Sequence, residues 1–294
     1  MSTVRDFLGR FRVKAKIWLG PAGIPGMCKE RSTLAGVRCV AEIGLNAMEI
    51  EFVRGITLTQ KAAEEVGKIA QELGVRLSVH CPYFINLCSP DKKKVEASKQ
   101  RILESARRAH AMGADIVVFH PGYYSGRSPE EAYRTVKEAD SDMIAKLEKE
   151  GIDDVFLGHE TTGKQSAFGT LEEIVSLCKE LSKCRPVVDF AHIYARQGGR
   201  IDYAQILDAL KPLKLDHLHT HFTAMEWTPA KQAGAGNEKR HLPMRAGDPP
   251  FRPLAEEVLK RGMKITIISE SPVLELDSLE MKKIFEKLGY RFER

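Results

Sequence analysis

Histidine and carboxylate side chains recur along this chain, most of them where a short apolar segment ends. The candidates are His80, His120, Glu160, Asp189, His192, His219, His241 and Glu270. Imidazole and carboxylate together suit zinc, manganese and iron. One divalent ion needs about three or four protein ligands, with a position left open for water or substrate. Eight candidates exceed the needs of one ion, so the set predicts a site with more than one metal.

A shared carboxylate would link such ions into one reactive centre. Glu160 stands in the middle of the order and could bridge two ions. Clustered metals suit phosphodiester hydrolysis, because they activate water, neutralise the phosphate and stabilise the leaving oxygen. The residue types therefore favour a metal-dependent hydrolase with Glu160 at the centre of catalysis.

Not every histidine fits this role. One histidine at a strand end is more often a core or loop residue than a ligand, whereas candidates at six consecutive strand ends favour ligation. His110 precedes Gly113 near an expected helix C-terminus, where a cationic imidazole complements the helix dipole. His159 neighbours Glu160, so it points to the other side of its strand and should pack or support rather than bind metal.

The elements that position these residues follow a repeated pattern: an amphipathic helix, a glycine-containing turn and a short apolar strand. Residues 73–80, 112–120, 150–160 and 261–270 are instances. The glycine fits a helix C-terminus, and the apolar strand suits a parallel sheet buried on both faces. Strands are expected near 14–19, 47–52, 76–80, 115–120, 155–160, 186–190, 215–221 and 265–270. Helices are expected near 31–44, 58–73, 91–112, 129–149, 170–182, 203–210, 251–261 and 276–287.

Eight such units predict an α/β fold, a (β/α)8 TIM barrel, with residues 1–294 as a single domain. In this barrel the carboxyl ends of the strands build the active site, which would gather the candidates. On the seventh strand, the two-residue period puts His217, His219 and His221 on one face. At most one or two of them should bind metal directly, and the others would lie deeper or at the rim. The one long irregular segment, 223–250, is expected to be a functional or mobile loop.

Composition narrows the class of protein further. With 43% hydrophobic and 29% charged residues, the chain is typical of a globular protein, and no apolar run is long enough for a membrane span. Residues 1–6 lack a signal-peptide core, so we expect a cytoplasmic protein. The net charge of +5 permits a polyanionic partner without demanding one. The six cysteines form no CxxC pair, so we expect buried or incidental thiols.

The motifs around the candidates resemble those of endonuclease IV, the metal-dependent apurinic/apyrimidinic endonuclease family of xylose-isomerase-like TIM barrels. The most specific block is His80-Cys81-Pro82-Tyr83-Phe84-Ile85-Asn86-Leu87, which is similar to the family's His-x-x-Tyr-x-Ile-Asn-Leu. Residues 119–122, 160–164, 189–192 and 269–272 resemble its later blocks, and His219 aligns best with its strand-seven ligand.

The resemblance implies two or three zinc ions, with manganese possible. The first would be held by His80, His120 and Glu160. The second would be held by Glu160, Asp189, His219 and Glu270. The third would be held by His192 and His241.

The resemblance also implies the reaction and the partner. A metal-activated hydroxide would cleave damaged duplex DNA 5′ to an abasic site. Arg54, Tyr83 and Phe84 would contact the DNA at the lesion. An abasic nucleotide is cheap to extrude from the duplex, because it has no base to unpair. No membrane and no obligate protein partner are implied.

The chain departs from the family pattern at several points. Lys239 stands at the aspartate position of the family's Asp-x-His block, and Glu238 is one residue out of register. The segment 18–25 lacks the usual histidine, and 223–250 differs as well. These departures keep two alternatives open. One is a sugar isomerase or epimerase with a single ion on Glu160, Asp189, His219 and Glu270. The other is a non-catalytic barrel that binds DNA or a metabolite.

Overall fold

The computed structural model describes residues 15–292 of the chain. Residues 1–6, on which the expected cytoplasmic location depends, lie outside this range. Within it, no helix has the length and apolar character needed to cross a membrane.

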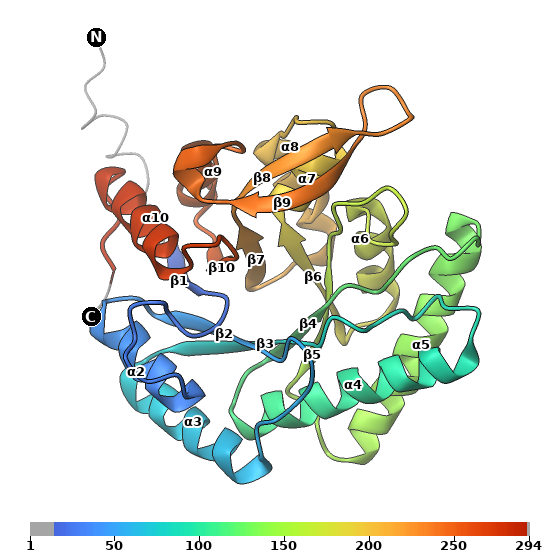
Figure 1. Cartoon of the computed structure of the whole chain (residues 1–294), viewed down its shortest axis with the longest axis horizontal. Helices are drawn as coiled ribbons and strands as arrows, with labels where there is room; N and C mark the ends of the chain where they lie inside the picture. Colours follow the sequence, from blue (N-terminus) through green and yellow to red (C-terminus); the bar gives the residue numbers. More distant parts are fainter. Residues whose placement is uncertain (1–14, 293–294) are drawn as a thin grey trace.

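Eight parallel strands form a barrel, as the sequence predicted (Figure 1). They are β1 (Lys16–Pro21), β2 (Ala47–Glu51), β3 (Arg76–His80), β4 (Ile116–Phe119), β5 (Phe156–Glu160), β6 (Cys184–Asp189), β7 (Leu218–Phe222) and β10 (Lys264–Ser269). The hydrogen-bonded order is β1-β10-β7-β6-β5-β4-β3-β2. The expected strand positions agree with these bounds to within a few residues, because buried β-branched runs leave little choice of conformation.

The barrel closes between β1 and β2 through one short seam. A parallel bridge joins Ala22 to Glu49, and the Gly23 N–H donates to the Glu49 carbonyl at 2.9 Å. The Asn46 side chain accepts from the Leu19 N–H at 2.8 Å and donates to the Ile17 carbonyl at 3.1 Å. Asn46 thus takes the place of a missing ladder rung. This seam fixes the position of Glu49 at the inner wall.

Helices surround the barrel in the expected positions (Figure 1). They are α2 (Thr33–Glu42), α3 (Gln60–Leu73), α4 (Lys92–Ala111), α5 (Pro129–Lys149), α6 (Leu171–Glu180), α8 (Tyr203–Ala209), α9 (Phe251–Arg261) and α10 (Glu275–Lys287). Capping boxes at Ser128 and Thr170 confirm the two helix starts that hydroxyl and early acidic residues signal. Each helix presents an apolar face to the barrel, and these faces form the main core.

The segment between β7 and α9 contains a β-hairpin, so the expectation of one irregular loop is wrong. Strands β8 (Ala224–Pro229) and β9 (Gly236–Leu242) pair antiparallel beside α7 (Phe190–Arg196), another element not expected (Figure 1). Met225 and Trp227 of the hairpin pack against Ala191 and Ala195 of α7. The charged sequence of β9 did not predict a strand. The hairpin is stabilised instead by its packing against α7.

The prediction that all six cysteines are buried or incidental thiols is wrong for two of them. Cys28 and Cys39 form a disulfide with a Cα–Cα distance of 6.0 Å. It ties the segment after β1 to helix α2. The other four cysteines are buried free thiols, as expected. The sequence could not pair Cys28 with Cys39, because their approach depends on how α2 packs against the preceding loop.

The β1–β2 seam predicts a sharp cost for any side chain at Gly20. A Cβ added there would lie 1.7 Å from the Ala47 carbonyl oxygen, whereas a Cβ at Gly55 would meet nothing within 4 Å. We expect Gly20→Ala to lower the free energy of unfolding by about 2–3 kcal/mol, because the strands must separate to admit the methyl group. Gly55→Ala is the matched control, and chemical denaturation measures both. Equal stability of the two variants would contradict the seam.

Candidate metal centre

The carboxyl ends of the strands bring most of the predicted site residues to one end of the barrel. The contributing positions are the last residues of β3, β5 and β6, a residue near the end of β7, and the residues just after β4 and β10. They carry His80, Glu160, Asp189, His221, His120 and Glu270, respectively. All are buried except His120 and Glu270, which are partly exposed. Because the strands are parallel, their carboxyl ends lie at the same end of the barrel. Every second side chain of each strand points inward, so the inward-facing residues at these ends come together.

Glu160 lies at the centre, with its two oxygens facing different histidines. Its Oε2 lies 3.2 Å from His80 Nε2 and 2.9 Å from His120 Nε2. Its Oε1 lies 3.1 Å from His192 Nδ1 and 3.4 Å from His221 Nδ1. One carboxylate therefore serves two ligand groups, the arrangement needed to bridge two ions.

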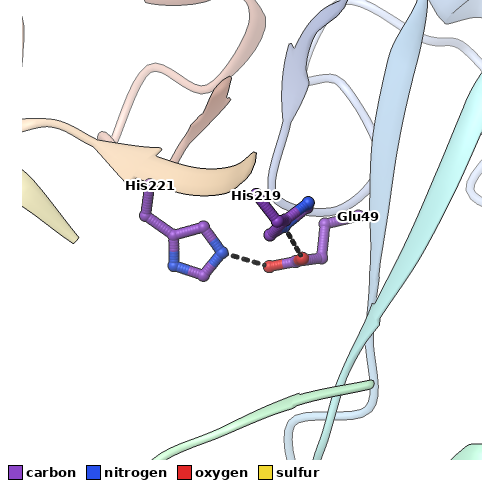
Figure 2. A group of neighbouring side chains, drawn as sticks. All are labelled: Glu49, His219 and His221. Atoms are coloured by element: carbon purple, nitrogen blue, oxygen red, sulfur yellow. Dashed lines mark hydrogen bonds and ion pairs between the residues drawn. The ribbon is translucent and has the colours of Figure 1, made fainter. Parts of the chain in front are cut away.

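The strand-seven residue in the second group is His221, whereas the sequence had assigned His219. Ligand atoms of Glu160, Asp189, His221 and Glu270 all lie within 4.8 Å of one another. His219 lies one layer deeper, with its Nε2 2.9 Å from Glu49 Oε2 (Figure 2). The two-residue period placed both histidines on the inner face but left their depth open, and the register of β7 decides it.

His192 and His241 meet in the third group, where the structure also brings Glu238. The two imidazole rings lie 5.6 Å apart, and Glu238 Oε2 lies 3.0 Å from His192 Nε2. Lys239, which replaces the family's aspartate, instead pairs with Glu226 on the exposed side.

A register shift in the hairpin explains how Glu238 reaches the site. Trp227 pairs with Glu238, while the preceding Glu226 pairs with Arg240, so Lys239 is an extra residue in β9. Such a bulge re-aims the side chains beyond it. Glu238 and His241 consequently share the inner face, although two residues separate them.

Backbone carbonyls fix the orientation of three histidines. Nδ1 of His80 lies 2.9 Å from the Cys81 carbonyl, and Nδ1 of His192 lies 2.9 Å from the Thr161 carbonyl. Nδ1 of His241 lies 3.0 Å from the Glu270 carbonyl. A carbonyl only accepts, so each Nδ1 carries a proton, and Nε2 is the nitrogen that would bind a metal in place of its own proton. Metal-binding histidines use their second nitrogen in this way.

Two carboxylates on β2 lie beside the centre and were not among the predicted site residues. Glu49 and Glu51 are two residues apart and both point into the barrel, where Glu49 contacts His219 and His221. Glu51 pairs in register with His80 on the neighbouring strand β3, which places it beside the first group. The available signal was a pair of acids at strand spacing inside an otherwise apolar strand.

Mutual electrostatics hold this centre in a mixed charge state. Burial alone would lower the pKa of His80, but Glu51 and Glu160 outweigh it and raise that pKa to about 10. Burial would raise the pKa of Glu160, yet His120 and His221 keep it well below its usual range. Burial raises the pKa of Glu51 to about 7.

Unpaired atoms in the described part of the chain fit divalent ions. Five buried atoms of the three groups have no hydrogen-bond partner there: Glu160 Oε1, Asp189 Oδ2, Glu238 Oε2 and both ring nitrogens of His221. Buried polar atoms are rarely left in this state. All five belong to residue types that bind zinc or manganese. The residues present therefore fit the predicted ions.

The remaining singled-out residues lie outside this centre. His159 points away from it, with its Nε2 2.9 Å from Asp140 Oδ2, as its place beside Glu160 predicted. His110 pairs with Asp154 on the surface. Arg54, Tyr83 and Phe84 are exposed on the loops after β2 and β3, at the same end of the barrel as the metal centre. The Tyr83 N–H donates to the Val53 carbonyl, which holds the two loops together.

Comparison with known proteins gives a consistent family. The family described as xylose isomerase-like TIM barrel matches residues 37–287. The uncharacterized protein MJ0133 of Methanocaldococcus jannaschii is 33% identical over 277 residues, covering 92% of this chain and 97% of that protein. A probable endonuclease 4 of Mycoplasma mobile is 28% identical over 224 residues, covering 72% of this chain and 74% of that protein.

Two solved structures share the fold. Endonuclease IV from Thermus thermophilus superposes with a TM-score of 0.64 at 19% identity, over 93% of this chain and 97% of that one. A D-tagatose 3-epimerase-like protein superposes with a TM-score of 0.68 at 19% identity, over 91% of this chain and 96% of that one. At these identities the likeness shows the fold alone.

The shifted pKa values predict how the stability of the metal-free protein depends on pH. The pKa of His80 rises from its ordinary 6.5 to about 10 on folding, so its stabilisation is complete below pH 6.5 and lost towards pH 10. The pKa of Glu51 is raised to about 7, so its contribution to stability is also lost as the pH rises towards 7. The lowered pKa of Glu160 adds no change in this window, because its contribution is complete above its ordinary value.

We therefore expect the thermal unfolding midpoint of chelator-treated protein to fall from pH 6.5 to pH 10. Zinc should restore it, because bound ions replace the protons. Differential scanning calorimetry with and without zinc measures this. A midpoint that rises with pH in the metal-free protein would contradict the charge state described.

The bulge predicts that Glu238, and not Lys239, supports the third metal. We expect Glu238→Gln to bind about one zinc ion fewer per chain, because a neutral amide is a weaker ligand than a carboxylate. Lys239→Ala should keep the wild-type number, since this side chain lies on the exposed side with Glu226. Metal analysis of dialysed protein gives the count. Loss of an ion in the lysine variant instead would show that the register is different.

Proposed function

The chain belongs to the xylose isomerase-like TIM barrel family, and on that premise we propose that it is a metal-dependent phosphodiesterase that cleaves duplex DNA 5′ to abasic sites. Its cofactors are two or three zinc ions, with manganese as a substitute. Its partner is damaged DNA. Glu160 is the central catalytic ligand.

The division of Glu160 between two ligand groups carries this proposal. An isomerase of this fold needs chiefly one ion. Here a single-ion quartet would already be complete with Glu160, Asp189, His221 and Glu270. Four more histidines and a carboxylate stand around it without a task in single-ion chemistry: His80, His120, His192, His241 and Glu238. A multinuclear phosphodiesterase uses them all.

The proposed ligand sets follow the geometry. His80, His120 and Glu160 hold the first ion; Glu160, Asp189, His221 and Glu270 hold the second; His192, Glu238 and His241 hold the third. Bound there, the ions would supply water activation and neutralise charge on the phosphate and on the leaving oxygen. The protein itself keeps the Nε2 atoms of His80, His192 and His241 aimed inward through backbone carbonyls.

The rim around the centre has side chains suited to a DNA duplex. Tyr83 and Phe84 are 66% and 63% exposed, and Val53 and Tyr123 lie exposed on the neighbouring loops. Large apolar residues left in water at the mouth of a site mark an interaction surface. Aromatic and apolar side chains of this kind insert between base steps, and Arg54 adds a positive charge.

The two aromatic loops are fastened to each other. The Leu87 N–H donates to the Pro121 carbonyl at 2.9 Å, and Asn86 Nδ2 donates to Ser125 Oγ at 3.2 Å. Gly122 lies so close to Asn86 that a Cβ there would be 2.4 Å from its side-chain oxygen. These contacts join the loop that carries Tyr83 and Phe84 to the loop that carries Tyr123. A fixed aromatic platform favours stacking on a distorted duplex.

Relatives named probable endonuclease 4 support the same reaction. They match over much of the chain at 27–31% identity.

A sugar epimerase is the second candidate, and one observation favours it. The quartet of Glu160, Asp189, His221 and Glu270 alone forms a site for one ion, in which the ion would polarise sugar oxygens and a carboxylate would move the proton. The fold hosts both chemistries, so the reaction must be tested directly.

Incision of abasic DNA tests the proposal. The substrate is a duplex with one tetrahydrofuran abasic analogue, and zinc or manganese is supplied. We expect a single nick 5′ to the lesion. Glu160→Gln should slow it by about 100-fold or more, because it removes the charge that both ligand groups share.

Asp140→Asn is the matched control, since Asp140 is an equally buried carboxylate that faces His159 on the outer side of the barrel wall. It should cut at the wild-type rate. An intact lesion strand with metal-loaded wild-type protein would rule the nuclease out. About one ion per chain together with epimerisation of a ketose would establish the alternative.

A further inference from the structure

We infer that Glu49 is a positioning residue that sets the tautomer and orientation of His221 and thereby builds the second metal site. The inference rests on the metal centre of the proposed function. It concerns a β2 residue outside the three ligand sets.

His221 differs from the other inward-facing histidines of the centre. In His80, His192 and His241 a backbone carbonyl holds the proton on Nδ1, so Nε2 faces the ligand groups. In His221 the nitrogens are reversed. Its Nδ1 faces Glu270 Oε1 at 3.2 Å and Glu160 Oε1 at 3.4 Å. Its Nε2 points to the β2 wall.

Glu49 meets that second nitrogen. Its Oε1 lies 2.8 Å from His221 Nε2 (Figure 2). The two atoms are at ion-pair distance, and neither of them has a hydrogen-bond partner among the described residues. A negative carboxylate there favours a proton on Nε2, which leaves the Nδ1 lone pair free towards Glu160 and Glu270. The charge of Glu49 thus selects the protonated nitrogen of His221, as backbone carbonyls do for His80, His192 and His241.

Two side chains hold the carboxylate, and a backbone hydrogen bond holds the residue itself. Ser78 Oγ, its β3 neighbour in register, donates to Oε2 at 2.7 Å. His219 Nε2 donates to the same oxygen at 2.9 Å (Figure 2). The Glu49 backbone carbonyl accepts the Gly23 N–H across the barrel seam. With no exposed surface and this support, Glu49 cannot turn away from His221.

This arrangement also gives His219 a task. It lies outside the three proposed ligand sets, although its ligand atom is within 4.8 Å of those of Glu49 and His221. It occupies Glu49 Oε2, which leaves Oε1 for His221. The two imidazole rings stand edge-on at 5.6 Å. The pattern matches carboxylate–histidine–metal triads, in which the outer carboxylate orients the ligand and strengthens it as a base.

Zinc affinity and the nitrogen spectrum of His221 test the role. Metal-free wild-type, Glu49→Ala and Glu49→Gln proteins are titrated with zinc against a chromophoric chelator. Loss of a supporting partner of this kind weakens metal binding by about 10–100-fold. We expect the alanine variant near the upper end of this range. The glutamine variant, which keeps the shape and an acceptor oxygen but not the charge, should lie near the lower end.

Long-range proton–nitrogen NMR of histidine-labelled, zinc-loaded protein reads the tautomer directly. Wild-type protein should show His221 protonated at Nε2 and bound through Nδ1. The alanine variant should lose this signature, while His80, His192 and His241 keep theirs. Asp140→Asn, which alters a buried carboxylate beside a histidine on the outer wall, should leave both the affinity and the spectrum unchanged.

Two results would overturn the inference. Wild-type zinc affinity in both Glu49 variants would show that His221 needs no partner. Loss of one whole ion, with the rest bound at wild-type affinity, would make Glu49 a ligand rather than a positioning residue. Neither result depends on DNA cleavage. A protein that binds zinc normally but leaves abasic DNA intact would refute the proposed reaction and leave the role of Glu49 standing.

Discussion

Buried negative charge at one end of a closed barrel is the constraint on which this structure depends. Glu160 and Asp189 have no exposed surface, and Glu270 is only partly exposed. An uncompensated carboxylate in such a place is very costly. Imidazoles supply part of the compensation, and several buried atoms of the ligand groups, among them Glu160 Oε1 and Asp189 Oδ2, remain without a hydrogen-bond partner in residues 15–292. The strands must hold these groups together against their repulsion, so barrel closure at Gly20 and Asn46 supports the chemistry as well as the fold.

The inner wall is organised in layers, and each layer has its own task. The upper one carries the ligand groups around Glu160. The layer below carries Glu49, Ser78 and His219, whose hydrogen bonds fix the layer above. Ile116, Val118 and Val187 form a small apolar cluster on the wall beside these residues, where Val187 pairs in register with His219. Gly158 leaves the space for it, because a Cβ there would lie 2.8–2.9 Å from Ile116 and Val187. Polar and apolar contacts thus share the packing around the ligand groups.

Most of the fold and part of the candidate site could be predicted from local sequence patterns. The other features depend on contacts between distant parts of the chain. Apolar strands that end in histidine or carboxylate identified the barrel and the surroundings of Glu160. The same periodicity placed His219 and His221 on one face without telling their depth, which the register between β7 and its neighbours sets. Glu49 was overlooked because it lies inside a strand rather than at its end. The Cys28–Cys39 disulfide and the hairpin beside α7 arise from packing that no local pattern records.

The bulge at Lys239 bears on how such sites can be recognised from sequence. One residue more or less between two ligands on a strand normally turns one of them to the opposite face. Here the strand accommodates the extra residue, so Glu238 and His241 both lie beside His192 although two residues separate them. An odd sequence spacing on a strand is therefore compatible with two side chains on the same face. Searches that demand a fixed interval between ligands will pass over chains that have the geometry at another spacing.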